Sequence, residues 1–135
     1  MNLNFGFSRE RRIIRVHVPR YSELASTTVD LRSGNTTVNN LISEAITLRS
    51  SSGNITVDNI NTQNLNLNLR SGNLRLANST ISNLVSESNS GNVNIDNISA
   101  LGARIEVTSG NIRMNGDFLG TTYLTARSGN IVFNT

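Results

Sequence analysis

Two glutamates, Glu87 and Glu106, are the residues whose spacing in this sequence could support catalysis. They are 19 positions apart, and a chain repeating with that period would bring their backbones to about 5 Å from each other. Two carboxylates this close are the arrangement that retaining glycosidases use as acid and nucleophile. Arg104 lies just before Glu106 and could neutralise the pair. Asp58 and Asp96 form a second, wider pair.

Other features of the sequence argue against an enzyme. We expect no aromatic platform for a sugar beside either pair, and carboxylates with arginine neighbours are common on solvated surfaces. The serines of the repeat described below cannot act as nucleophiles together, because His17 is the only histidine. The chain has no cysteine and no lysine, which excludes thiol, zinc-thiolate and Schiff-base chemistry. We therefore predict no enzymatic activity, no cofactor and no metal site.

A sequence repeat indicates which secondary-structure elements would position the two glutamates. The tripeptide Ser-Gly-Asn occurs six times, and the step from each of its glycines to the next is always 19 positions. A fixed period of this size indicates one small structural unit stacked on copies of itself. Glycine can adopt the positive φ of a sharp corner, and Ser and Asn can bond the local backbone there. The corner residues are Gly34, Asn35, Gly53, Asn54, Gly72, Asn73, Gly91, Asn92, Gly110, Asn111, Gly129 and Asn130.

Counting each repeat from its serine defines 19 columns, and two groups of columns alternate as strands do. Columns 4 and 6 are apolar in nearly every repeat, as at Ile55 and Val57, with mostly polar residues between them. Columns 14 to 18 alternate in the same way, with Leu65, Leu67 and Leu69 pointing inward. The pattern predicts two strands and two corners per coil, which leaves no room for a helical crossover.

These strands predict an all-β fold, namely a parallel β-solenoid (β-helix) in which each strand pairs with its counterpart one coil away. We expect a single domain over residues 1–135, with about six to seven right-handed coils that follow the repeat. Residues 1–32 would form an irregular N-terminal strand and capping coil, and residues 33–135 the regular coils. Val18 is the expected counterpart of Val38 one coil earlier. The two are 20 positions apart, one more than the period, so the first coil should be slightly irregular.

Stacking would place like residues directly above one another. The corner asparagines would then form a ladder along the rod axis, because an amide both donates and accepts hydrogen bonds. Such a ladder could be a binding surface, but corner stabilisation is the favoured interpretation. A second, partial ladder consists of Asn40, Asn59, Asn78 and Asn97.

The repeat 71–89 fits the pattern least well, because Ser86 and Ser88 occupy inward columns. Two outcomes are open. Either these small polar side chains are buried against backbone, or the strand slips by one residue and turns Val85 inward.

The N-terminal segment is basic. Residues 1–20 carry five arginines against one glutamate, whereas the chain as a whole has a net charge of +3. The cluster formed by Arg9, Arg11 and Arg12 could meet an anionic envelope polymer or a protein partner. It could equally be a charged cap that discourages pairing at the open edge of the first coil. Before it, Leu3 and the two phenylalanines that follow alternate as in a strand that covers the first coil.

The C-terminal repeat carries bulkier side chains, Phe118 and Tyr123, and Phe133 follows them. Bulky residues at the end of a solenoid suggest a hydrophobic cap or a contact surface. An exposed parallel strand edge with apolar side chains favours pairing with another copy of the chain.

The chain resembles a bacterial family of adhesin-type β-solenoids with Ser-Gly-Asn or Ser-Gly-Asp repeats, whose function is otherwise unknown. The matching stretches are SGNTTV, SGNITV, SGNLRL, SGNVNI, SGNIRM and SGNIVF, together with the upstream IIRVHVPR. The resemblance covers nearly the whole chain. It implies a solenoid fold and a cell-envelope or surface setting, and it brings no catalytic residues. The third motif position is always Asn and never Asp, which argues against a calcium ladder.

Two functions from different classes remain open. The chain is either a non-enzymatic, adhesin-like interaction module of the cell envelope, or a structural protein that polymerises end to end through parallel strand pairing. We expect no nucleic-acid partner, because no aromatic residues interleave with the arginine cluster. The sequence shows no transmembrane run and no signal-peptide pattern, which would fit a cytoplasmic protein, so the location stays open between cytoplasm and envelope.

Overall fold

Every strand of the described chain pairs in parallel with a strand one coil away, which confirms the predicted β-solenoid. The computed structural model describes residues 2–7, 12–17 and 23–135, and it describes side chains from Ser26 onward except that of Leu31. Within these residues, all regular structure is β-strand. The strands are β1 (Asn2–Phe7), β2 (Arg12–His17), β3 (Glu23–Ser52), β4 (Ile55–Ser71), β5 (Leu74–Ser90), β6 (Val93–Ser109), β7 (Ile112–Phe118), β8 (Thr122–Ser128) and β9 (Ile131–Asn134).

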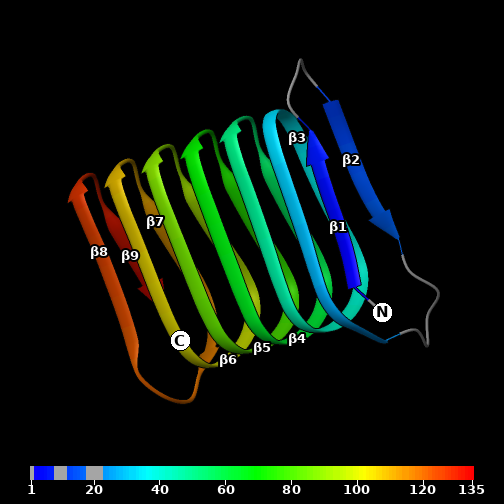
Figure 1. Ribbon diagram of the computed structural model, residues 1–135. Coiled ribbons are helices and arrows are strands. Elements are labelled where there is room, and N and C mark those ends of the chain that lie inside the picture. The colour runs from blue at the N-terminus through cyan, green and yellow to red at the C-terminus, as the bar shows by residue number, and fades with distance from the viewer. Residues whose placement is uncertain (1, 8–11, 18–22) are drawn as a thin grey trace.

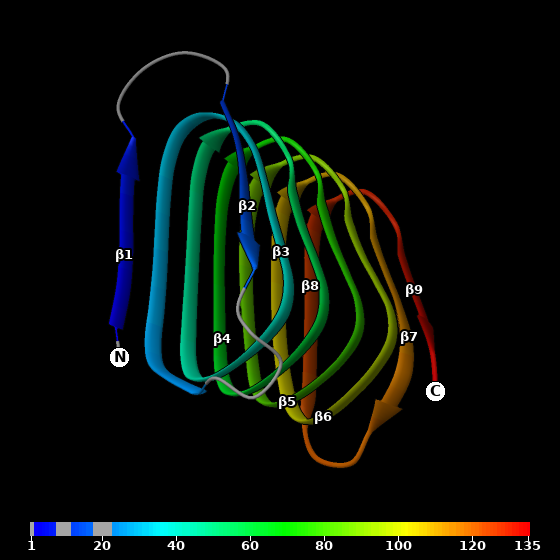
Figure 2. The same ribbon diagram turned by 90° about the vertical axis from the view of Figure 1, so that its right-hand side faces the viewer.

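The strands stack in the order β1-β3-β4-β5-β6-β7-β9, while β2 also pairs with β3 and β8 with β6. The stack makes about six turns (Figure 1). Seen from the N-terminal end, β3 rises beside β1, crosses the top and descends beside β2, while later coils recede behind (Figure 2). This winding is right-handed, as predicted.

The core is a thin stack of aliphatic side chains inside the coils. Leu65, Leu67 and Leu69 are buried, whereas Asn66 and Asn68 between them are exposed. The same alternation repeats at each coil, because the parallel register pairs every residue with its equivalent one period later. The predicted inward positions of columns 4, 6, 14 and 16 are therefore confirmed.

Each regular coil also has a third inward-facing run, so the prediction of only two strands per coil is wrong. Columns 9 and 11 hold buried residues, among them Leu41, Ile60 and Ile98. The chain reaches this run through an asparagine of positive φ in column 8, for example Asn59 at 53°. Asparagine tolerates this left-handed conformation better than most side chains do. The bend keeps columns 6 and 9 both inward, although a regular strand would point them to opposite faces.

The weak repeat keeps its register. Ser86 pairs with Leu67 on one side and with Ile105 on the other, so the strand does not slip. The first of the two predicted outcomes is therefore correct: Ser86 and Ser88 are buried polar residues. Ser79, in the third run of the same coil, is also buried, and its hydroxyl donates to the carbonyl of Ala77 at 2.7 Å.

The N-terminal coil differs from the prediction in length. β1 lies beside residues 26–31 and β2 beside residues 34–39, so the predicted first strand does cover the first coil. Val38, however, pairs with Val16 and not with Val18, which makes this coil longer than predicted. Val16 and Val18 are two positions apart and would point to the same face of a strand, so the alternation alone could not show which of them pairs with Val38. Val18 lies outside the described residues.

The last coil departs from the period at one point. Ile98 pairs with Gly116, one position short of the full period, and the regular spacing returns where Ala103 pairs with Thr122. The omitted residue belongs to column 8, so this coil has no left-handed asparagine. The length is recovered in the loop 119–121 that joins β7 to β8, visible as a protrusion in Figure 1.

Candidate interaction surfaces

The Ser-Gly-Asn corners form a closed hydrogen-bond lattice. The glycine N–H donates to the serine carbonyl of the next coil, as Gly72 does to Ser90 at 3.1 Å. The asparagine N–H donates in the opposite direction, as Asn92 does to Oδ1 of Asn73 at 3.0 Å. The same bond joins every successive pair of corner asparagines from Asn35 to Asn130. The corner amide oxygens are therefore occupied within the fold, which leaves them poor ligands for a partner.

The second asparagine ladder, in column 8, is only partly connected. Asn59 donates to Oδ1 of Asn40, and Asn97 donates to Oδ1 of Asn78 at 2.7 Å. Between these two pairs the ladder is interrupted, because Asn78 donates instead to a carboxylate oxygen of Asp58. This ladder is exposed and retains unused amide groups, unlike the corner ladder.

The C-terminal end of the solenoid exposes its core. Ile131 and Phe133 of β9 are 42% and 39% exposed, whereas Ile112 and Met114, one coil earlier in the same columns, are buried. Phe133 stacks on Phe118 with ring centroids 5.3 Å apart and an angle of 44° between the rings. The bulky residues singled out from the sequence thus do meet at this end, although Tyr123 lies on the side of the coil rather than in its interior.

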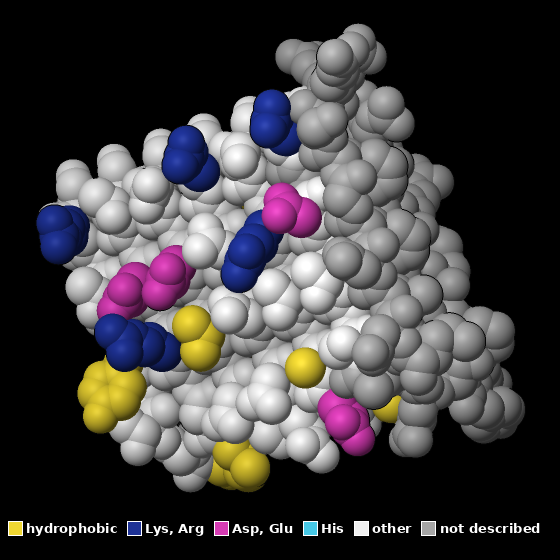
Figure 3. Space-filling view, in the orientation of Figure 1, with side chains coloured by type: hydrophobic (Ala, Val, Ile, Leu, Met, Phe, Trp, Pro, Cys, Tyr) yellow, Lys and Arg dark blue, Asp and Glu magenta, His cyan; other side chains and the backbone are white. Residues whose placement is uncertain are grey.

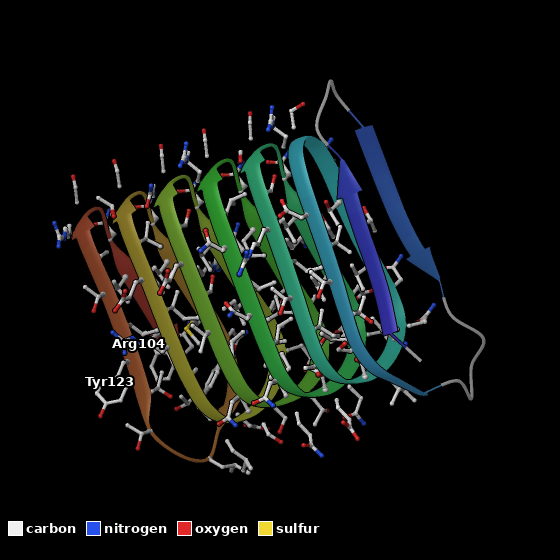
Figure 4. All side chains as sticks on the ribbon, in the orientation of Figure 1. Arg104 and Tyr123 are labelled. Atoms are coloured by element: carbon white, nitrogen blue, oxygen red, sulfur yellow. The ribbon has the colours of Figure 1, made fainter. Side chains whose placement is uncertain are left out.

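Acidic and arginine side chains lie close together on the flat side of the solenoid that faces the viewer in Figure 3, the side on which Figure 4 labels Arg104. Glu87 and Glu106 are register partners on β5 and β6. Arg104 donates from Nε and Nη2 to the same oxygen of Glu106, at 3.1 and 2.7 Å. This hydrogen bond and the charge of Glu106 raise the pKa of Arg104, with smaller contributions from Glu87 and Tyr123.

One aromatic side chain lies next to the arginine of this cluster. Tyr123 on β8 is the register partner of Arg104, and Figure 4 shows the two side chains next to each other. Counting columns would have found this contact, because Arg104 and Tyr123 both occupy column 15. The cluster is nevertheless open to solvent, with Glu87 exposed and Glu106 half-exposed. An acid for glycoside hydrolysis needs a shielded environment that this flat face does not offer.

The predicted basic cluster falls mostly outside the described residues. Arg9 and Arg11 are not among them, and Arg12 begins β2 without a described side chain. Among the described residues, no group of His, Asp or Glu is arranged to hold a metal ion. Nor does the described part of the chain contain a helix long and apolar enough to cross a membrane.

Parallel coils of constant register, glycine corners and an aliphatic stack together define the class of the protein, a β-solenoid repeat domain. The chain belongs to the Toastrack DUF4097 family, whose model matches residues 1–134. Neither the curated proteins nor the solved structures contained a match to the chain. The family match agrees with the solenoid repeat implied by the sequence resemblance, and it lends no support to the adhesin role that came with it.

Proposed function

We propose that this protein is a non-enzymatic structural module that associates end to end through the strand edge of its C-terminal coil. One observation carries the proposal. Ile131 and Phe133 belong to the buried columns of the solenoid, yet about two fifths of each side chain is exposed. Another coil stacked on this surface would remove the exposed apolar area from water.

The same end also carries open backbone groups. Among the described strands, β9 pairs only with β7, and β8 pairs only with β6. The outer side of each strand therefore has N–H and C=O groups free for another strand, which is how sheets are extended by a partner. A partner that hydrogen-bonds to the free backbone groups of both β8 and β9 must itself be a coil whose two strands are as far apart as β8 and β9.

A second copy of this chain supplies such a coil. Within each copy, β1 pairs with residues 26–31 of β3, which occupy columns 13 to 18. Likewise, β2 pairs with residues 34–39 of β3, which occupy columns 2 to 7. By the same register, Phe5 of one copy would face Leu124 of another, and Val16 would face Phe133. Apolar columns would thus continue from copy to copy. Because the two surfaces are different, the contact does not close on itself and would build filaments.

The adhesin-like, envelope-associated role suggested by the repeat motif is compatible with this proposal. A rigid rod that multiplies its lateral surface by stacking is a suitable scaffold for display. An anionic partner for Arg9, Arg11 and Arg12 is a further part of that expectation, and it concerns side chains outside the described structure.

The experiment that tests the proposal compares two lysine substitutions by sedimentation velocity over a concentration series. Ile131→Lys puts a charge into the exposed end column, where it should block stacking without disturbing the folded core. Leu101→Lys changes an exposed leucine of β6 that lies outside the end column, and is the matched control. We expect wild type and Leu101→Lys to form concentration-dependent oligomers and Ile131→Lys to stay monomeric. A wild-type protein that is monomeric at every concentration would overturn the proposal.

A further inference from the structure

A groove runs along the solenoid axis beside the column 8 asparagines. It consists of two adjoining hollows of about 680 and 280 Å³ that share Asn78 and Thr80. One wall is the ladder of column 8, and the other is column 10, two residues further along each coil. The column 10 wall contains Ile42, Asn61, Thr80 and Ser99, and Asp117 adds to the groove at its C-terminal end.

The left-handed asparagines create this groove. At Asn40, Asn59, Asn78 and Asn97 the backbone has φ between 50° and 55°. The bend residues form one wall and the residues two positions later form the other, and stacking repeats this arrangement once per coil. The groove therefore follows the stack of coils, with one side chain from each wall per coil at a spacing of about 4.8 Å.

The column 10 wall offers side chains without internal partners. Asn61 and Thr80 are exposed, and neither side chain makes a hydrogen bond to another described residue. Ser99 continues the same row with an unbonded hydroxyl. The fold uses the polar groups of the corner lattice, but it leaves this row of amide and hydroxyl groups to solvent or a ligand.

The lining also restricts the kind of ligand. The only ionisable residue among those lining the two hollows is Asp117, so a polyanion would meet no compensating positive charge. A strand of peptide could not add to the sheet here, because the strands that form the groove in the middle coils are paired on both sides. The hollows expose more polar than apolar surface, and their amides and hydroxyls match a ligand rich in hydroxyl groups.

We propose that this groove binds a linear, neutral, β-1,4-linked polysaccharide lying along the solenoid axis. An extended chain of this linkage advances per sugar ring by nearly the same distance as one coil of the solenoid. Each ring would therefore meet one side chain from column 8 and one from column 10, and successive rings would present opposite edges because the β-1,4 linkage turns each ring over relative to the last. Asn61 and Thr80 would hydrogen-bond the ring hydroxyls in the middle of the groove. This site is separate from the C-terminal edge and does not depend on end-to-end association.

The proposal predicts how binding depends on the length and linkage of the ligand. The left-handed bend recurs in four coils, so we expect affinity to rise up to about four rings and then to level off. Glucose oligomers linked β-1,4, with and without N-acetylamino groups, are the probes. Oligomers of α-1,4-linked glucose have the same composition but coil, so they should bind at least tenfold more weakly. Titration calorimetry on the whole protein would measure these affinities.

Two double variants locate the site. Asn61→Ala with Thr80→Ala removes an amide and a hydroxyl of the groove that have no hydrogen-bond partner within the fold. We expect this double variant to bind the β-1,4-linked tetramer at least tenfold more weakly. Asn66→Ala with Asn68→Ala removes two exposed amides from another face of the same coil and should leave binding unchanged. Thermal unfolding of both variants checks that the fold is retained, and Thr80→Val alone replaces the first variant if it unfolds.

Three results would overturn the inference. The first is no binding of any β-1,4-linked oligomer. The second is equal affinity for the α-1,4-linked and β-1,4-linked series, and the third is equal loss in the two double variants. If only the N-acetylated series binds, the acetamido group is the recognised feature and the ligand class narrows accordingly.

Discussion

At the residue scale, the corner glycines have no side chain, and this allows the backbones of neighbouring coils to approach closely enough to hydrogen-bond. A Cβ atom built on Gly91 would lie 1.6 Å from the carbonyl oxygen of Gly72, one coil earlier. Gly91 also has a φ of 128°, a conformation that side chains rarely adopt. The backbones approach this closely because the corner N–H and C=O groups bond from coil to coil. Steric space and backbone angle therefore require glycine independently.

This requirement predicts a sharp contrast within a single coil. Gly91→Ala should lower the free energy of unfolding by about 4 kcal/mol or more, because the clash is with backbone that cannot move aside. Gly102→Ala is the control, since its Cβ would meet nothing closer than 3.7 Å. The control should change stability by less than about 1 kcal/mol. Urea unfolding followed by circular dichroism measures both, and equal losses in the two variants would contradict this account of the corner.

At the element scale, a single coil is not a stable unit, and its apolar columns gain their burial from the coils above and below. Leu67 illustrates this dependence, because it is 1% exposed and its register partners are Leu48 and Ser86. Even a coil with serines in three inward columns keeps its register, since the coils on both sides fix it.

A charge placed in this stack should therefore be far more damaging than one placed beside it. We expect Leu67→Asp to unfold the protein or make it insoluble, because the core provides no partner for a carboxylate. Asn68→Asp introduces the same group on the outward face, one residue later, and should stay folded. Solubility and circular dichroism distinguish the two variants. A soluble, folded Leu67→Asp protein would show that the assigned inward register is incorrect.

The elements that could be predicted from the sequence are those fixed by period and alternation. The constant spacing of the repeat and the apolar columns around Ile55 and Leu67 were sufficient for the parallel stack, because only one register buries them all. The third inward run was missed because its columns mix Leu41 and Ile60 with Ser43 and Thr62. Small polar residues weaken an alternation signal even where they are buried.

The candidate sites depended on features that a pattern does not encode. The groove exists because the column 8 asparagines are left-handed, and an asparagine in a sequence permits that angle without requiring it. The contact between Arg104 and Tyr123 is the exception: it could have been predicted from their shared column, because they are a full period apart in neighbouring repeats. The predicted bulky C-terminal coil is present, and its exposure could be assessed only once the neighbouring strands were placed.

At the scale of the whole molecule, the solenoid has two different ends and a uniform middle. One end presents β1 and β2, and the other presents β8 and β9, with all four strands in the parallel register of the stack. Association through these ends would continue the fold without a new kind of contact. The lateral groove and the flat face would then repeat along the filament at fixed intervals.

The most direct test of this account is a disulfide between copies in the predicted register. Asn4 lies beside Thr28 in column 15, so in a head-to-tail contact its free side should meet Tyr123 of the next copy. The protein has no cysteine, and strands at about 4.8 Å permit a disulfide between facing residues. Asn4→Cys with Tyr123→Cys should therefore give a ladder of covalent multimers on mild oxidation. Asn4→Cys with Val85→Cys, in the same column but mid-solenoid, should give no such ladder, and equal cross-linking of the two pairs would contradict end-to-end association.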